Sequence, residues 1–97
     1  MALEIEWSNE AEKQLDEVIK HIENRWTEKE LNSFFSRLEQ SLEAIQKNPN
    51  TYKNSQRQKG VKEFLVHPHN TIFYTFDKTK IHIISFWSNR MFLDKEK

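Results

Sequence analysis

The chain has 97 residues, no cysteine, and fifteen acidic against fifteen basic side chains. At this length we expect residues 1–97 to form a single domain, and the missing cysteines exclude a disulfide framework and thiolate metal sites. No apolar run approaches the ~20 residues of a membrane span, and the N-terminal segment lacks the basic and apolar regions of a signal peptide, so we expect a cytoplasmic protein with no membrane partner.

The zero net charge conceals a division along the chain. Residues 1–47 carry eleven Asp and Glu against six Lys and Arg, whereas residues 48–97 carry four against nine. The division falls at Asn48-Pro49, where the hydrophobic period also changes from helical to strand-like. We therefore expect an acidic helical layer and a basic sheet layer, and the basic layer favours an acidic polypeptide or a phosphate backbone as a partner.

The first elements in chain order are a strand and a helix. Residues 3–7 alternate apolar and acidic side chains, which predicts a strand with one exposed face. Ser8 and Asn9 follow as candidate helix N-caps, and Asn9 has Glu12 at capping-box spacing. Apolar residues then recur every three or four positions, as on one face of an amphipathic helix: Ala11, Leu15, Val18, Ile19, Ile22 and Trp26.

A second helix begins almost at once. Thr27 and Glu30 have the spacing of a capping box, and Trp26 and Leu31 stand at the two positions of a hydrophobic staple. Pro49 disfavours helical geometry in the residue before it, so we expect this helix to end near Asn48. Because so little chain separates the two helices, they should form an antiparallel hairpin. The apolar stripe of the second helix is Leu31, Phe34, Phe35, Leu38, Leu42 and Ile45.

The second half of the chain predicts a loop and a sheet. Residues 50–60 are polar and end at Gly60, the only glycine, where a positive φ is expected. Strand-like runs cover 61–67, 71–77 and 80–87, and their short links indicate antiparallel pairing. Ile72, Tyr74 and Phe76 mark one face, and Ile81, Ile83 and Ser85 line a face of the next strand. The predicted fold is α+β with the order β-α-α-β-β-β: an N-terminal strand and an antiparallel helical hairpin packed on a small, largely antiparallel sheet.

The basic segment from Asn50 to Lys62 is the first candidate site. It contains no acidic residue, so it could contact phosphates or an acidic partner. The alternative is a solvated loop whose charges keep the sheet edge soluble. Its cations are Lys53, Arg57, Lys59 and Lys62.

Arg90 is the second candidate, because it follows the last predicted strand. A guanidinium there could clamp a phosphate or a carboxylate through two parallel hydrogen bonds, or it could form an ordinary surface ion pair. Trp87, near Arg90 at the strand end, is a candidate contact residue. We expect most of the other strand aromatics to lie in the core: Phe64, Phe73, Tyr74, Phe76 and Phe86.

The histidines are the third candidate. His67 and His69 are two residues apart and His82 lies on a later strand, so a metal site is conceivable. However, Pro68 predicts a turn and no carboxylate lies close in sequence. A general-base role for one of these histidines is more credible than metal binding. We expect neither a metal nor a cofactor.

Several segments, taken in order, resemble the RelE/ParE superfamily of bacterial type II toxins over nearly the whole chain. The resemblance implies a small cytoplasmic toxin held inactive by a cognate antitoxin. It also implies one of two activities: ribosome-dependent cleavage of mRNA, or ParE-like inhibition of DNA gyrase. The segments are Trp7-Ser8; Ala11, Leu15, Ile19 and Ile22; Leu38, Leu42 and Ile45 before Asn48-Pro49; Asn70 to Ile72 and Tyr74; and Ile81, Ile83 and Ile84 before Asn89-Arg90.

Several features favour the gyrase branch. Members that cleave mRNA often carry Tyr or His near the C-terminus, whereas residues 91–97 contain neither. The near-neutral isoelectric point is poorly suited to an enzyme that binds in the phosphate field of the ribosome, and the long hairpin helices resemble the ParE-like branch. As a departure from the family pattern, Lys62 stands where many members have Arg. Cleavage of RNA through its own 2′-hydroxyl needs a base, an acid and cations. Arg90 and Lys62 could supply the cations and His67, His69 or Glu63 a base, but no separate acid is evident.

Three hypotheses remain at this level. The leading one is a ParE-like inhibitor that binds DNA gyrase without chemistry of its own. The second is a RelE-like mRNA endonuclease acting on the ribosome, with catalytic candidates Arg90, Lys62, His67 and His69. The third is a degenerate, non-toxic relative that retains antitoxin binding. In each case we expect an acidic antitoxin as the partner. The chain could form a homodimer or a heterotetramer with the antitoxin. The candidate residues for binding the target or the antitoxin are Arg57, Lys59, Lys62, Trp87 and Arg90.

Overall fold

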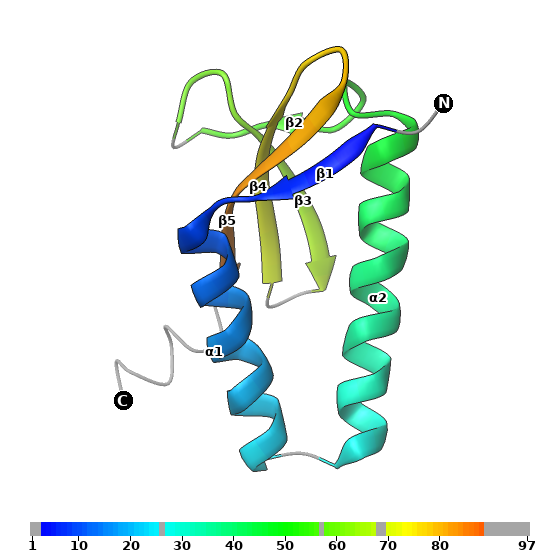
Figure 1. The fold of residues 1–97 in the computed structure, drawn as a ribbon, viewed down its shortest axis with the longest axis vertical. Coiled ribbons are helices and arrows are strands. Elements are labelled where there is room, and N and C mark those ends of the chain that lie inside the picture. The colour runs from blue at the N-terminus through cyan, green and yellow to red at the C-terminus, as the bar shows by residue number, and fades with distance from the viewer. Residues whose placement is uncertain (1–2, 26, 57, 68–69, 89–97) are drawn as a thin grey trace.

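The computed structural model describes residues 3–25, 27–56, 58–67 and 70–88, with only the backbone of residue 67. Two helices form a hairpin beside a five-stranded sheet, which confirms the predicted α+β class (Figure 1). The elements in chain order are β1 (Glu4–Trp7), α1 (Asn9–Arg25), α2 (Glu28–Lys47), β2 (Lys53–Asn54), β3 (Lys62–His67), β4 (Asn70–Phe76) and β5 (Lys80–Ser88).

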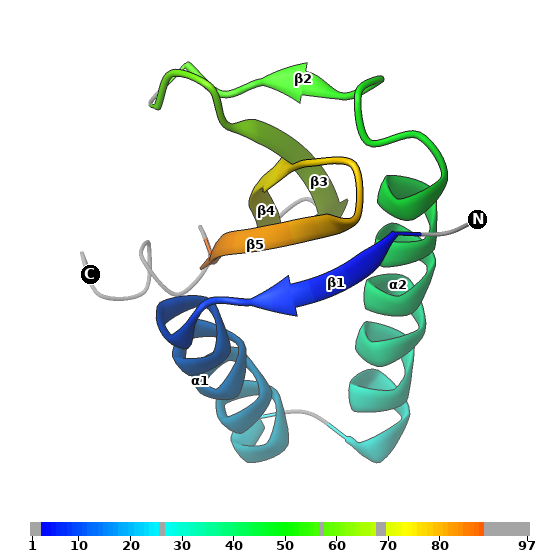
Figure 2. The same ribbon diagram turned by 45° about the horizontal axis from the view of Figure 1, so that its top comes forward.

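The strand order is β1-β5-β4-β3-β2. β1 lies parallel to β5, with Glu6 opposite His82, while every other neighbouring pair is antiparallel. Figure 2 shows β1 beside β5 at one edge, with α1 continuing from the end of β1. β1 and β5 are therefore direct neighbours although they are far apart in the sequence. The helical hairpin carries the chain from β1 at one sheet edge to β2 at the other.

One strand was not expected. Lys53 and Asn54 form β2, in a segment that the polar composition had predicted as a loop, by pairing with Glu63 and Lys62. A side-chain hydrogen bond supports this pairing: the Lys62 ammonium donates to Asn54 Oδ1 at 3.0 Å. Gly60, in the turn that leads into β3, has the expected positive φ, 83°.

The N-cap of α1 is Ser8, and the prediction of an Asn9 capping box is wrong. Ser8 Oγ accepts from the Ala11 amide at 3.0 Å and donates to the Ile84 carbonyl at 2.8 Å, while the Ser8 amide donates to the Ile83 carbonyl. Asn9 is already the first helical residue. The Ser8 hydroxyl therefore serves two elements: it caps the first turn of α1, and it satisfies the Ile84 backbone carbonyl of β5.

Both predicted ends of α2 are confirmed. The Glu30 amide donates to Thr27 Oγ1 at 3.4 Å, which is the cap predicted from the sequence. The proposed hydrophobic staple of Trp26 and Leu31 is not tested, because Trp26 lies outside the described residues. At the C-terminal end, the Tyr74 hydroxyl donates to the Pro49 carbonyl at 2.7 Å and so fixes the end of the helix to β4.

The core lies between the helices and one face of the sheet. Ile81 and Ile83 are fully buried there, as expected, but Phe86 rather than Ser85 is the next residue of this face. The reason is a register shift: Phe73 lies opposite Ser85 and Tyr74 opposite Ile83, so Ile84 is an extra residue. The buried residues of the core are Ala11, Val18, Phe34, Leu38, Ile45, Val66, Ile72, Tyr74, Ile81, Ile83 and Phe86.

Candidate functional site

The two faces of the sheet differ in what they contact. Residues directly opposite one another in neighbouring strands project from the same face. Ile72 and Tyr74 belong to the core beneath the helices, so residues in register with them share that face. The opposite face, which we call the open face, carries the intervening residues of β4: Thr71, Phe73 and Thr75.

Lys62 and Trp87 lie on different faces. Lys62 is opposite Tyr74 and therefore projects on the helix side, whereas Trp87 is opposite Thr71 and projects on the open face. The structure thus does not bring these two candidate residues together. Arg57, His69 and Arg90 lie outside the described residues, as does the side chain of His67.

The Lys62 ammonium is held by two neutral oxygens. It donates to the Tyr52 carbonyl and to Asn54 Oδ1, both at 3.0 Å. The Tyr52 ring packs edge-on against Phe64 with 4.7 Å between centroids. Lys62 therefore ties the β2 segment to β3.

The other described cations of the basic segment differ in environment. Lys53 Nζ lies 3.7 Å from Glu63 Oε1 across β2 and β3, so part of its charge is compensated locally. Lys59 is exposed in the turn before Gly60. Of these two, Lys59 is the one available to a partner without loss of that ion pair.

At one end of the open face, a row of three residues in register crosses three strands and has an apolar side chain at each end. Leu65 and Trp87 flank Thr71 in register, and Leu65 is 62% exposed. Phe73, partly buried, lies next to this row on the same face of β4. An exposed leucine on a sheet face that also carries two aromatic residues is the type of surface that protein interfaces bury.

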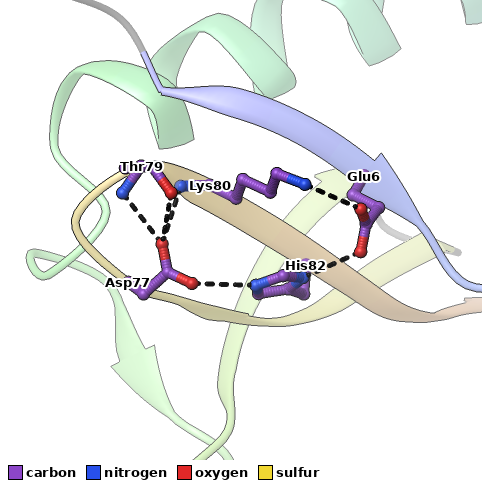
Figure 3. A network of polar contacts seen from close by, with 5 residues as sticks. All are labelled: Glu6, Asp77, Thr79, Lys80 and His82. Carbon is purple, nitrogen blue, oxygen red and sulfur yellow. Dashed lines mark hydrogen bonds and ion pairs between the residues drawn. The ribbon is translucent and has the colours of Figure 1, made fainter.

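At the other end of the open face lies a network of charged residues that sequence reasoning did not identify (Figure 3). The two ring nitrogens of His82 contact two carboxylates: Nδ1 lies 3.2 Å from Glu6 Oε1, and Nε2 lies 3.2 Å from Asp77 Oδ2. Glu6 Oε2 accepts from Lys80 Nζ at 3.3 Å. Asp77 Oδ1 accepts from the backbone amides of Thr79 and Lys80, each at 2.8 Å.

These contacts shift the pKa values of all three titrating groups. Hydrogen bonds from the Thr79 and Lys80 amides, and then from His82, hold the pKa of Asp77 well below its ordinary value. Hydrogen bonds from Lys80 and His82 lower the pKa of Glu6. The Asp77 carboxylate, followed by that of Glu6, raises the pKa of His82 above 6.5.

This network is not arranged for metal binding or base catalysis. The two carboxylates lie on opposite edges of the His82 ring, so their oxygens do not converge on one point. Within the described ranges, no group of three or more His, Asp or Glu side chains could hold a metal ion. Both ring nitrogens of His82 contact carboxylates, so neither nitrogen is free to act as a general base toward a substrate.

The sequence held a partial signal for this network. The alternation of residues 3–7 predicts that Glu6 lies on the solvent-exposed face of its strand. An Asp two residues before Thr79 is typical of a turn in which the carboxylate accepts from a following backbone amide. The decisive contact joins residues 76 positions apart and depends on the parallel register of β1 against β5. That register is not visible in either strand alone.

None of the helices in the described part of the chain is both long and apolar enough to cross a bilayer.

Comparison with known proteins identifies one family. The family model described as ParE toxin of type II toxin-antitoxin system, parDE, matches residues 5–92. None of the curated protein sequences is a match.

Solved structures share the fold at low sequence identity. The chromosomal ParDE toxin–antitoxin system from P. aeruginosa aligns with a TM-score of 0.75 and 12% identity, over 90% of this chain and 96% of that one. The YoeB dimer from Staphylococcus aureus gives 0.62 and 19%, over 90% and 97%. The E. coli DinJ–YafQ toxin–antitoxin complex gives 0.60 and 13%, over 94% and 97%.

Proposed function

Because the chain belongs to the ParE toxin family of type II toxin–antitoxin systems, within the RelE/ParE superfamily, we propose that it inhibits DNA gyrase by binding. The observation that carries this proposal is the family match, which spans residues 5–92 and so includes both layers of the fold. In this proposal the protein acts in the cytoplasm and has no chemistry of its own.

The described geometry supports binding over catalysis. His82 has a carboxylate on each ring nitrogen, and the Lys62 ammonium is bound on the helix side of the sheet. The open face instead offers the apolar side chains of Leu65 and Trp87, on either side of the buried Thr71. A surface of this kind buries apolar area against a protein, and no reaction is required for inhibition.

The second candidate is ribosome-dependent cleavage of mRNA. It is retained because the YoeB and YafQ structures share this fold as well as the ParDE system, and fold alone does not separate activities. In this case Arg90 and Lys62 would stabilise charge and His67 or His69 would act as the base. A third candidate is a non-toxic relative that only binds antitoxin.

A cognate acidic antitoxin is the proposed partner. Two of the similar structures are a toxin–antitoxin system and a toxin–antitoxin complex, so a partner of this class fits the fold. We expect an antitoxin segment to become ordered on the sheet and the helical hairpin, with its apolar side chains on the open face. Arg57, Lys59 and Arg90 are the proposed cationic contacts, in a heterotetramer or with a homodimer of the chain.

Two assays on the purified chain separate the candidates. We expect inhibition of gyrase supercoiling and no mRNA cleavage when programmed ribosomes are added. Leu65→Ser should weaken the inhibition. Lys29→Ala, at an exposed position of α2, should not weaken it. Ribosome-dependent cleavage would overturn the gyrase proposal, and a folded chain that is inactive in both assays would support the non-toxic relative.

A further inference from the structure

His82 contacts Glu6 on β1, which is 76 positions away in the sequence, and Asp77 in the turn just before its own strand. The role proposed here for these contacts is separate from the proposed function. We propose that Glu6, His82 and Asp77 form a pH-responsive clasp. With His82 as an imidazolium, the clasp fixes the edge strand β1 and the β4–β5 turn to β5. When His82 loses its proton, both segments loosen.

The contacts themselves require the charged ring. A neutral imidazole has one N–H, so its other nitrogen would direct a lone pair at a carboxylate oxygen. Only the imidazolium can donate to Glu6 Oε1 and Asp77 Oδ2 together, and both lie at 3.2 Å. The geometry therefore assigns the ring a proton on each nitrogen.

The charges around the ring act in the same direction. Glu6 from β1 and Asp77 from the turn contact it directly, and Lys80 of β5 neutralises part of Glu6. Glu4 lies opposite Lys80 in the register, and Thr75 of β4, opposite His82, is neutral. Lys78 belongs to the same turn as Asp77. Two carboxylates in contact and one ammonium leave a negative charge that the imidazolium compensates.

The segments held by the clasp are short. β1 has four residues and, among the strands of the described residues, pairs with β5 alone. Beyond that ladder, the Gln46 side chain donates to the Leu3 carbonyl at 2.7 Å, the Lys80 ammonium contacts Glu6, and the apolar side chains at positions 3, 5 and 7 pack on the core. Asp77 organises the turn through the Thr79 and Lys80 amides. Loss of one charge at His82 thus weakens the attachment of the strand and the turn together.

The direction of the switch follows from the titrating groups. Both carboxylates have lowered pKa values and stay ionised above neutral pH, while the pKa of His82 is raised. The clasp therefore opens as the pH rises through the raised pKa of His82. His82 is 37% exposed, so hydroxide and buffer reach the ring without unfolding.

Amide hydrogen exchange on the full chain tests the clasp. Protection factors, corrected for base catalysis, are measured for residues 4–7 and 79–81 between pH 6 and 9, with the His82 ring nitrogens followed by NMR. In the wild type we expect protection to fall about threefold to fivefold as His82 deprotonates, the size typical of exposed charge pairs. His82→Gln should show the lower protection already at pH 6 and no further fall.

Glu4→Gln, on the same strand and face, is the matched control and should behave as the wild type. Glu6→Gln and Asp77→Asn keep the ring, and each should lower the pH at which His82 titrates, which tests the clasp even if His82→Gln folds poorly. A neutral His82 tautomer at pH 6, or the same fall in protection in His82→Gln, would show that the clasp does not exist.

Discussion

Lys62 and Trp87 project from opposite faces of the same sheet, although both had been candidates for one contact surface. Lys62 stands opposite Tyr74 on the helix side and holds the β2 segment, whereas Trp87 stands opposite Thr71 on the open face beside Leu65. The two residues therefore have different predicted roles, and substitutions should separate them.

Lys62→Met should lower stability rather than partner affinity. It removes the donor to the Tyr52 carbonyl and Asn54 Oδ1, so we expect a loss of about 1 kcal/mol in the free energy of unfolding. Urea denaturation measures this loss. Lys59→Met, at an exposed position of the same basic segment, should leave the stability within about 0.5 kcal/mol of the wild type. Equal effects of the two variants would contradict the structural role of Lys62.

Tyr74→Phe should loosen the junction between α2 and β4. The variant loses the hydrogen bond to the Pro49 carbonyl, which we expect to cost about 1 kcal/mol in thermal or urea unfolding. Tyr52→Phe, which keeps the ring packed on Phe64, is the control.

The same hydroxyl makes stability fall at high pH. Burial raises the pKa of Tyr74 to about 12 from an ordinary value of 10. The folded state favours the neutral phenol, so this contribution is complete below about pH 10 and is lost as the pH rises toward 12. Urea midpoints for the wild type should decline over this interval more than those of Tyr74→Phe. Parallel declines would rule out a contribution from Tyr74.

Thr27→Ala should shorten or fray α2 at its start. The side chain accepts from the Glu30 amide, and loss of such a cap typically costs about 1 kcal/mol. Ser33→Ala, at an exposed position within the helix, is the control and should not destabilise the protein. Unchanged melting temperatures for both variants would contradict the cap.

Binding of the proposed antitoxin should weaken as salt increases. The electrostatic part is screened between low and physiological ionic strength, while burial against the open face persists. Calorimetric titration at several salt concentrations measures both parts, and Leu65→Ser should reduce the affinity that remains at high salt. An affinity that does not change with salt would contradict the acidic character of the partner.

Arg90→Ala tests the candidate that stands outside the described residues. If the protein inhibits gyrase, the variant should lose toxicity and supercoiling inhibition, because a guanidinium contact to the target is missing. If it cleaves mRNA, the same variant should lose ribosome-dependent cleavage, because charge stabilisation in the transition state is removed. In both cases it should stay folded and keep most of its antitoxin affinity, and full toxicity in the variant would exclude Arg90 from the site.

The sequence by itself determined both helices, β1, β3, β4 and β5, but not the short strand β2. The capping box at Thr27, the stop at Asn48 and the alternation of Ile72 and Tyr74 are local patterns, read from residues a few positions apart, and the structure confirms them. The family resemblance is confirmed as well, since it rests on the order of such patterns along the chain.

The tertiary structure alone decided which polar residues meet. Ser8 rather than Asn9 caps α1 because its hydroxyl also reaches Ile84 on β5, and Phe86 rather than Ser85 enters the core because β5 carries an extra residue. The contact between Glu6 and His82 depends on the parallel register of two strands that the whole helical hairpin separates. Side-chain spacing within a strand specifies a face, but the partner across a sheet is set by the register, which only the packing of the complete chain determines.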